Sequence, residues 1–73
     1  MIKLDLFGYR IDDIHNIVDD FIYENIKLQK KEVEILTRTN KSEIKQIIAE
    51  ILINYDLEYK ECSYNPSLLK ISI

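Results

Sequence analysis

The sequence predicts an α/β protein, a two-layer sandwich in which two helices cover one face of a four-stranded mixed sheet. Hydrophobic periodicity along the 73 residues gives the order β-α-β-α-β-β. Each predicted helix is apolar along one side only, so both helices pack on the sheet rather than inside a helical core. The chain contains one glycine and one proline, which leaves little length for linkers. We therefore expect a single domain over residues 1–73.

The first two elements differ in the spacing of their apolar residues. Residues 2–7 (IKLDLF) alternate between apolar and other side chains, which is the period of a half-buried strand. From Ile11 to about Leu28 apolar residues recur every three or four positions, which predicts a helix. Acidic residues in its first turn suit the positive end of the helix dipole. Gly8, between the two elements, is expected to serve the turn through a positive φ or through packing that excludes a Cβ atom.

The next strand and helix follow a polar connector. Residues 32–37 (EVEILT) are rich in β-formers and predict a strand. After residues 38–42 a second helix follows, and Asn40 with Glu43 resembles a capping box at its start. Its apolar stripe consists of Ile44, Ile47, Ile48, Ile51, Leu52 and Tyr55.

The last third of the chain is predicted to form a β-hairpin. Residues 57–64 and 68–73 flank a turn built on Asn65 and Pro66. Two crossover helices predict parallel pairing among the first three strands, and the hairpin predicts an antiparallel fourth strand. If that fourth strand lies at a sheet edge, it is able to pair with a second copy of the chain.

Composition excludes several classes of protein. No apolar segment approaches the roughly 20 residues of a membrane span, and no apolar N-terminal run has the length of a signal peptide, so no membrane association is expected. The lone Cys62 cannot form an internal disulfide and fits a reducing, cytoplasmic compartment. A single glycine rules out glycine-rich nucleotide-binding motifs. The single His15 has no neighbouring ligands, so neither a metal nor a cofactor is expected.

Two segments together resemble the Smr (small MutS-related) domain family. The segment LDLFGYRIDDIHNIVDDFI is similar to the start of that domain, which typically has L-D-L-H-G followed by an acidic and apolar helix. The segment VEILTRTNKSEIKQII aligns without a gap on the family pattern V-x-I-I-H-G-K-G-x-G-x-L-[RK]-x-x-V, and LLKISI takes the place of the last strand. The resemblance covers essentially the whole chain. It implies a domain that associates with nucleic acid and that in several members cleaves it.

The residues to which the family's nuclease activity is attributed are mostly replaced. Asp5 and Gly8 match the first motif, but its histidine is Phe7 in this chain. In the loop motif, the histidine, lysine and glycine positions hold Thr37, Arg38, Thr39, Asn40 and Ser42. Cleavage of a phosphodiester needs a base or metal to activate the nucleophile, and neither Phe7 nor a threonine supplies one. The sequence thus predicts a protein without catalytic activity. Asp5 is a vestigial candidate for residual metal-dependent cleavage and more simply an acceptor of backbone hydrogen bonds.

The first functional hypothesis is a catalytically inactive Smr-like module that binds RNA, DNA or a ribonucleoprotein surface. Residues 27–47 carry six basic and three acidic side chains in a chain of net charge −3. Arg38, Lys41 and Lys45 fall on the loop and first turn of the second helix, where free backbone N–H groups favour anions. Asn40 lies on the same loop, and Tyr9, beside the turn at Gly8, is a candidate to stack on a base.

The alternative hypothesis is a small protein–protein adaptor or inhibitor on the same scaffold. The first helix is acidic, with Asp19 and Asp20 near its middle, and such a surface suits a basic partner. Phe7 is predicted to be an exposed apolar anchor. The same acidic helix opposes extended binding along a nucleic acid. The partner and the oligomeric state stay open from the sequence.

Overall fold

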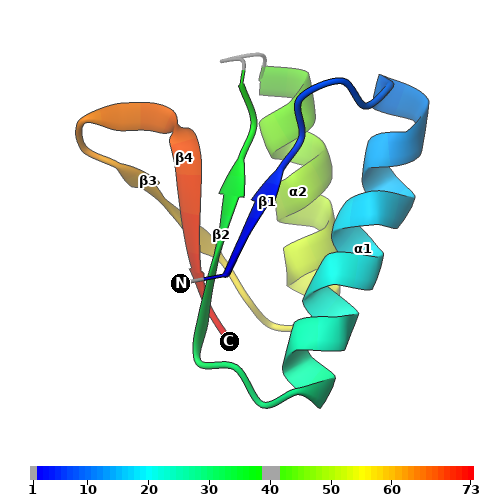
Figure 1. Cartoon of the computed structure of the whole chain (residues 1–73), viewed down its shortest axis with the longest axis vertical. Coiled ribbons are helices and arrows are strands. Elements are labelled where there is room, and N and C mark those ends of the chain that lie inside the picture. The colour runs from blue at the N-terminus through cyan, green and yellow to red at the C-terminus, as the bar shows by residue number, and fades with distance from the viewer. Residues whose placement is uncertain (1, 39–41) are drawn as a thin grey trace.

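The computed structural model describes residues 2–38 and 42–73 and contains two helices and four strands (Figure 1). The predicted order β-α-β-α-β-β is confirmed. The elements are β1 (Ile2–Asp5), α1 (Ile11–Lys27), β2 (Glu32–Leu36), α2 (Ser42–Asn54), β3 (Tyr59–Cys62) and β4 (Asn65–Ser72).

Both helices lie on the same side of one mixed sheet, as predicted (Figure 1). The strand order is β1-β2-β4-β3. β1 pairs in parallel with β2, and β4 runs antiparallel to both β2 and β3. The result is the two-layer sandwich expected from the one-sided helices. None of the helices within the described ranges is long and apolar enough to cross a membrane.

The predicted pairing among the first three strands is wrong for the third. β3 runs in the same direction as β1 and β2, but β4 lies between β2 and β3, so β3 pairs only with β4. β4 has eight residues and buries Leu69 and Ile71 completely, whereas β3 has four residues and buries only Cys62. The longer, more apolar strand takes the central position because both of its edges are then hydrogen-bonded. Pairing of β4 with a second copy is therefore excluded by its two neighbours.

The turn of the β-hairpin also differs from the prediction. It falls on Ser63 and Tyr64, while Asn65 and Pro66 already belong to β4. The Asn65 side chain accepts a hydrogen bond from the backbone N–H of Ser67 at 3.1 Å. Asn65 thus forms the side-chain-to-backbone hydrogen bond that is typical of turns, but it forms it within the first residues of β4. The register of β3 against β4 shifts between Glu61 and Cys62, and this irregularity accommodates the turn at Ser63 and Tyr64.

An apolar layer between the helices and the sheet forms the core. On the sheet, Val33 faces Ile71 across β2 and β4, and Ile35 faces Leu69. All four side chains are fully buried. The helices contribute buried residues at helical spacing, namely Ile14, Val18, Ile22, Ile44, Ile48, Ile51 and Leu52. Among the described residues, no helix lies over the opposite face of the sheet (Figure 1).

A polar contact joins α1 to the residue that follows α2. The Tyr55 hydroxyl, just after α2, donates a hydrogen bond of 2.7 Å to Asp19 Oδ1 on α1. This hydrogen bond raises the pKa of Tyr55, because the charged carboxylate stabilises the protonated phenol. The contact fixes the flank of α1 that carries Asp19 against α2.

Gly8 has a φ of +85°, which confirms the first of the two reasons considered for it. The second reason is not supported, because no described heavy atom lies within 4 Å of the position that a Cβ atom would take. We predict that Gly8→Ala lowers the free energy of unfolding by about 1 kcal/mol through backbone strain alone. Gly8→Asn, a residue that tolerates positive φ, should lose less. Urea denaturation measures both, and equal stability of Gly8→Ala and the wild type would contradict the account.

We predict that Tyr55→Phe lowers the free energy of unfolding by about 1 kcal/mol, because the hydrogen bond to Asp19 is lost while the ring remains. Tyr23→Phe is the matched control, since Tyr23 is exposed on α1. Urea denaturation of the three proteins makes the comparison. A Tyr55→Phe protein as stable as the control would show that the contact between the helices contributes nothing.

Candidate functional site

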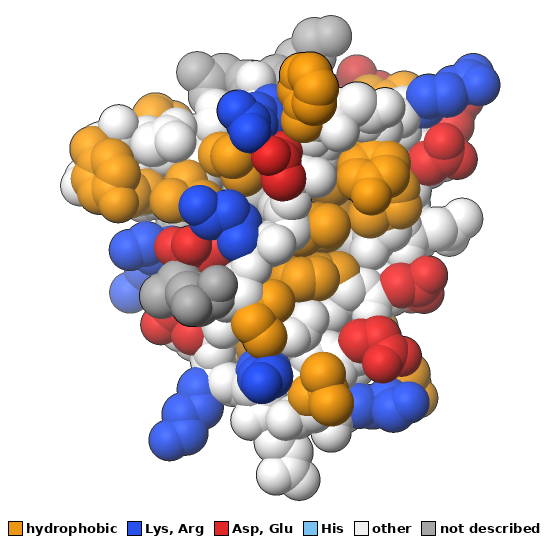
Figure 2. All heavy atoms as spheres, viewed as in Figure 1, with side chains coloured by type: hydrophobic (Ala, Val, Ile, Leu, Met, Phe, Trp, Pro, Cys, Tyr) orange, Lys and Arg blue, Asp and Glu red, His pale blue; other side chains and the backbone are white. Residues whose placement is uncertain are grey.

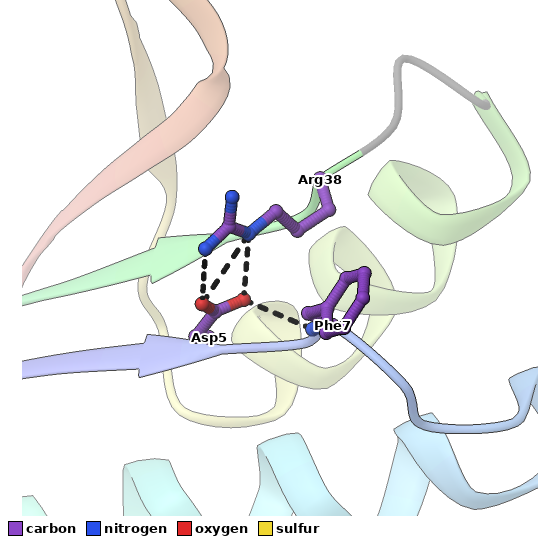
Figure 3. A network of polar contacts seen from close by, with 3 residues as sticks. All are labelled: Asp5, Phe7 and Arg38. Atoms are coloured by element: carbon purple, nitrogen blue, oxygen red, sulfur yellow. Dashed lines mark hydrogen bonds and ion pairs between the residues drawn. The ribbon is translucent and has the colours of Figure 1, made fainter.

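The candidate site lies where β1 and β2 end side by side. Asp5, the last residue of β1, pairs in register with Leu36, the last residue of β2. Phe7 follows shortly after β1 and Arg38 shortly after β2. Figure 3 shows that the side chains of Arg38 and Asp5 point toward each other above the strand ends, with the Phe7 ring beside them.

These three residues form a connected unit, named here the Asp5–Arg38–Phe7 cluster. Arg38 Nη2 lies 2.7 Å from Asp5 Oδ2, and Arg38 Nε lies 3.1 Å from Oδ1. The Phe7 backbone N–H donates to Asp5 Oδ1 at 2.9 Å. The guanidinium carbon of Arg38 is 5.7 Å from the centre of the Phe7 ring, within the range of a cation–π contact. The carboxylate thus connects the two residues that follow the strands.

The hydrogen bonds from Arg38, together with that from the Phe7 backbone, lower the pKa of Asp5 to about 2. The same ion pair raises the pKa of Arg38. The two charges therefore offset each other at neutral pH, although both side chains are about half exposed and solvent screens them. A carboxylate with so low a pKa is a poor proton acceptor near neutrality.

The backbone at this end of the sheet is specialised. Arg38 has a φ of +65°, in the left-handed region that suits a turn. The preceding residue, Thr37, is buried, and both its N–H and its hydroxyl donate to the carbonyl of Ser67, at 2.8 and 3.1 Å. The Thr37 hydroxyl is therefore directed into the protein. It tethers the end of β2 to β4.

The cationic set predicted from the sequence is only partly described. Asn40 and Lys41, with Thr39, lie outside the described residues. Lys45 is on α2, and its Nζ atom lies 3.0 Å from Glu61 Oε2 on β3, with 14% of the side chain exposed. Arg38 and Lys45, the described members of the set, are thus each paired with an acid on a different strand. The structure does not bring them together as an open anion site.

The residues of the predicted protein interface have different environments. Phe7 is 76% exposed and Tyr9 is 49% exposed, so an aromatic surface exists at this end of the sheet. Asp20 is exposed on α1. Asp19 is instead engaged by Tyr55. Sequence reasoning missed the pairing of Asp5 with Arg38, although the register of two adjacent parallel strands that end together is a signal for it.

A hollow lies at the end of the sheet opposite to the Asp5–Arg38–Phe7 cluster. Its volume is about 400 Å³. It is lined mainly by acidic and basic side chains of β2, β3, β4 and the loop before β3, including Glu32, Glu58, Lys60 and Lys70. Both signs of charge are present, so the hollow has no clear preference for an anion or a cation. Over residues 2–38 and 42–73, no group of three or more His, Cys, Asp or Glu residues is placed to hold a metal ion.

Comparison of the chain with protein-family models, with curated proteins and with solved structures finds no match in any of the three.

We predict that the Phe7 amide proton reports the titration of Asp5 with a midpoint at about pH 2. Because the folded pKa is depressed, the cluster's contribution to stability is present above the ordinary value of 3.8 and is lost as the pH falls through about 2. NMR spectra recorded over this range measure the midpoint. In Arg38→Gln the midpoint should rise toward 3.8, and a midpoint near that value in the wild type would contradict the ion pair.

Proposed function

We propose that this chain is a protein-binding module without a chemical step of its own, and that its contact surface is centred on Phe7. The observation that carries the proposal is the exposure of Phe7, 76%, on a turn outside the core, where a polar residue would cost the core nothing. Aromatic residues, phenylalanine among them, are enriched in the buried centres of protein interfaces.

The cluster supports this role because it orders the anchor before binding. The Phe7 N–H is held by Asp5, and its ring lies against the Arg38 guanidinium. Ordering a side chain during association costs roughly 0.5–1.5 kcal/mol, and an anchor that is already held avoids part of that cost. Tyr9, 49% exposed, and Ile11, 39% exposed, extend the apolar surface toward α1.

The distribution of charge favours a protein partner over a nucleic acid. The charge of Arg38 is offset by Asp5, and that of Lys45 by Glu61. The outer side of α1 carries exposed acids, namely Asp12, Asp13, Asp20 and Glu24. A polyanion meets repulsion along this helix, whereas a basic protein surface meets attraction.

The Smr resemblance enters this proposal as a scaffold. The order β-α-β-α-β-β and the retained Asp5 and Gly8 are compatible with it. In place of the motif histidines stand an exposed phenylalanine and a buried threonine. Asp5, with a pKa of about 2 and hydrogen bonds to both oxygens, serves better to position Phe7 and Arg38 than to accept a proton.

The proposal predicts that Phe7→Ala removes a binding partner. Immobilised wild type, Phe7→Ala and Tyr64→Ala are exposed to nuclease-treated extract from the native source. Tyr64 is the matched control, because it is 82% exposed but lies on the turn between β3 and β4. A protein retained by the wild type and by Tyr64→Ala, and lost with Phe7→Ala, is the expected result. Identical sets of proteins on all three would contradict the proposal.

Nucleic-acid binding is the second candidate, and one observation favours it. The exposed Phe7 ring and the Arg38 guanidinium lie together, and such planar groups stack on unpaired bases. Fluorescence anisotropy with an RNA hairpin, single-stranded RNA and duplex DNA, at low and near-physiological salt, tests it. The protein-binding proposal expects flat titrations at physiological salt. Salt-dependent binding that Phe7→Ala abolishes would replace it with a single-strand-binding role.

A further inference from the structure

The outer edge of β1 is free within the part of the chain that the structure describes. β1 is the first strand in the sheet order and has β2 as its one neighbour. The Leu6 N–H bonds to the Leu36 carbonyl, so the alternation of a parallel ladder directs the backbone groups of Leu4 toward β2 as well. The N–H and C=O groups of Lys3 and Asp5 consequently point away from the sheet.

The Asp5 carboxylate limits the length of this free edge. The next outward N–H group would be that of Phe7, and it is already occupied by Asp5 Oδ1 at 2.9 Å. The free edge is therefore short and has the exposed Phe7 ring at its end. A short edge resists indiscriminate pairing but retains the hydrogen-bonding groups that a defined strand would use.

An apolar strip runs beside this edge. Ile2 and Leu4 on β1, and Ile17 and Phe21 on α1, are half-buried and pack against the core. Asp19 turns toward α2, and at 100° per residue Ile17 and Phe21 lie on the opposite flank of α1, toward the outer side of β1. Figure 2 shows hydrophobic side chains gathered on the surface between β1 and α1.

Acidic residues border the strip along α1. Asp13, Asp20 and Glu24 are exposed and lie three or four positions from Ile17 or Phe21, so they share the same flank of the helix. In Figure 2 acidic side chains follow the hydrophobic strip down α1. When a peptide adds to an exposed sheet edge, backbone hydrogen bonds supply affinity and the neighbouring side chains set specificity. At this edge the neighbouring side chains are apolar and acidic, which favours a segment with basic side chains.

We propose that the edge of β1 accepts a short extended segment of a partner polypeptide, in which basic and β-branched residues alternate. The inference rests on the proposed function and specifies the partner's chemistry. The segment's backbone pairs with Lys3 and Asp5. Basic side chains on the helix side lay their apolar stems over Ile17 and Phe21 and place their charges at the acidic border. Side chains on the other side approach Phe7.

The probe for this surface is a labelled peptide of about seven residues, a common strand length, with alternating lysine and valine and blocked ends. Fluorescence anisotropy should detect binding to the wild type, and NMR should locate the largest shifts at the Lys3 and Asp5 amides. A peptide in which glutamate replaces lysine should not bind. Equal binding of the two peptides, or shifts confined to β3, the other edge strand, would overturn the proposal.

Charge reversal tests the acidic border. Asp20→Lys combined with Glu24→Lys should weaken binding of the lysine–valine peptide about tenfold, which two exposed ion pairs of typical strength supply. Glu43→Lys combined with Glu50→Lys on α2 changes the net charge equally and is the matched control. If the two double variants weakened peptide binding to a similar extent, the peptide would be held by attraction to the overall charge and not by this surface.

Backbone pairing is tested by Lys3→Pro against Lys3→Ala. Both remove the lysine side chain, but only proline removes the outward N–H, and the ladder to β2 does not use that donor. Binding should be lost in Lys3→Pro and kept in Lys3→Ala, with the fold of both checked by circular dichroism. If Lys3→Pro unfolds, the same amide is methylated by chemical synthesis. The proposal would be overturned if Lys3→Pro, or the protein methylated at this amide, bound the peptide as tightly as Lys3→Ala does.

These outcomes separate the inference from the function on which it rests. Suppose that a partner no longer binds Phe7→Ala but still binds folded Lys3→Pro. That result would support the contact surface at Phe7 and would overturn the addition of a strand to β1. A second copy of the chain as the occupant is detected by sedimentation. If the wild type forms dimers that the lysine–valine peptide does not dissociate, and if Lys3→Pro abolishes these dimers, the assignment to a basic partner would likewise be overturned.

Discussion

Burial of the apolar layer between the two helices and one face of the sheet is the constraint on which the rest of this structure depends. The central strands supply fully buried Val33, Ile35, Leu69 and Ile71, and both helices are apolar on one side only. One covered face is what 73 residues with two such helices can build. The surfaces left for function are accordingly the uncovered face of the sheet, the strand ends, the sheet edges and the outer side of α1.

Periodicity was sufficient to predict the elements, because the positions that must be buried recur every two residues on strands and every three or four on helices. The predicted helix from Ile11 to about Leu28 ends within a residue of α1. Strand order was not predictable in the same way. Whether β3 or β4 pairs with β2 depends on which strand is longer and more apolar, and so better suited to the centre of the sheet. The turn was also misplaced, because Asn65 and Pro66 are typical turn residues but belong to β4.

For the candidate site, the sequence indicated the residues but not their relation. Asp5, Phe7 and Arg38 were singled out separately, two of them as departures from the Smr pattern. In the folded chain Phe7 and Arg38 contact each other, and Asp5 binds both. The three residues thus form one interacting unit. Local spacing does not show this contact, because 33 positions separate Asp5 from Arg38; the signal is that two adjacent parallel strands end in register, which requires their alignment to be known.

The central position of β4 has a consequence for how the chain reaches its native state. During synthesis, β1, α1, β2, α2 and β3 all precede β4, yet β3 has no partner in the sheet until β4 has paired with it. Most of the core residues lie in β1, α1, β2 and α2, whereas β3 joins the sheet through β4 alone among the described strands. Insertion of β4 adds two ladders and the buried Leu69 and Ile71 together. Folding should therefore be strongly cooperative at its end, and β3 should be protected from hydrogen exchange only after β4 is in place.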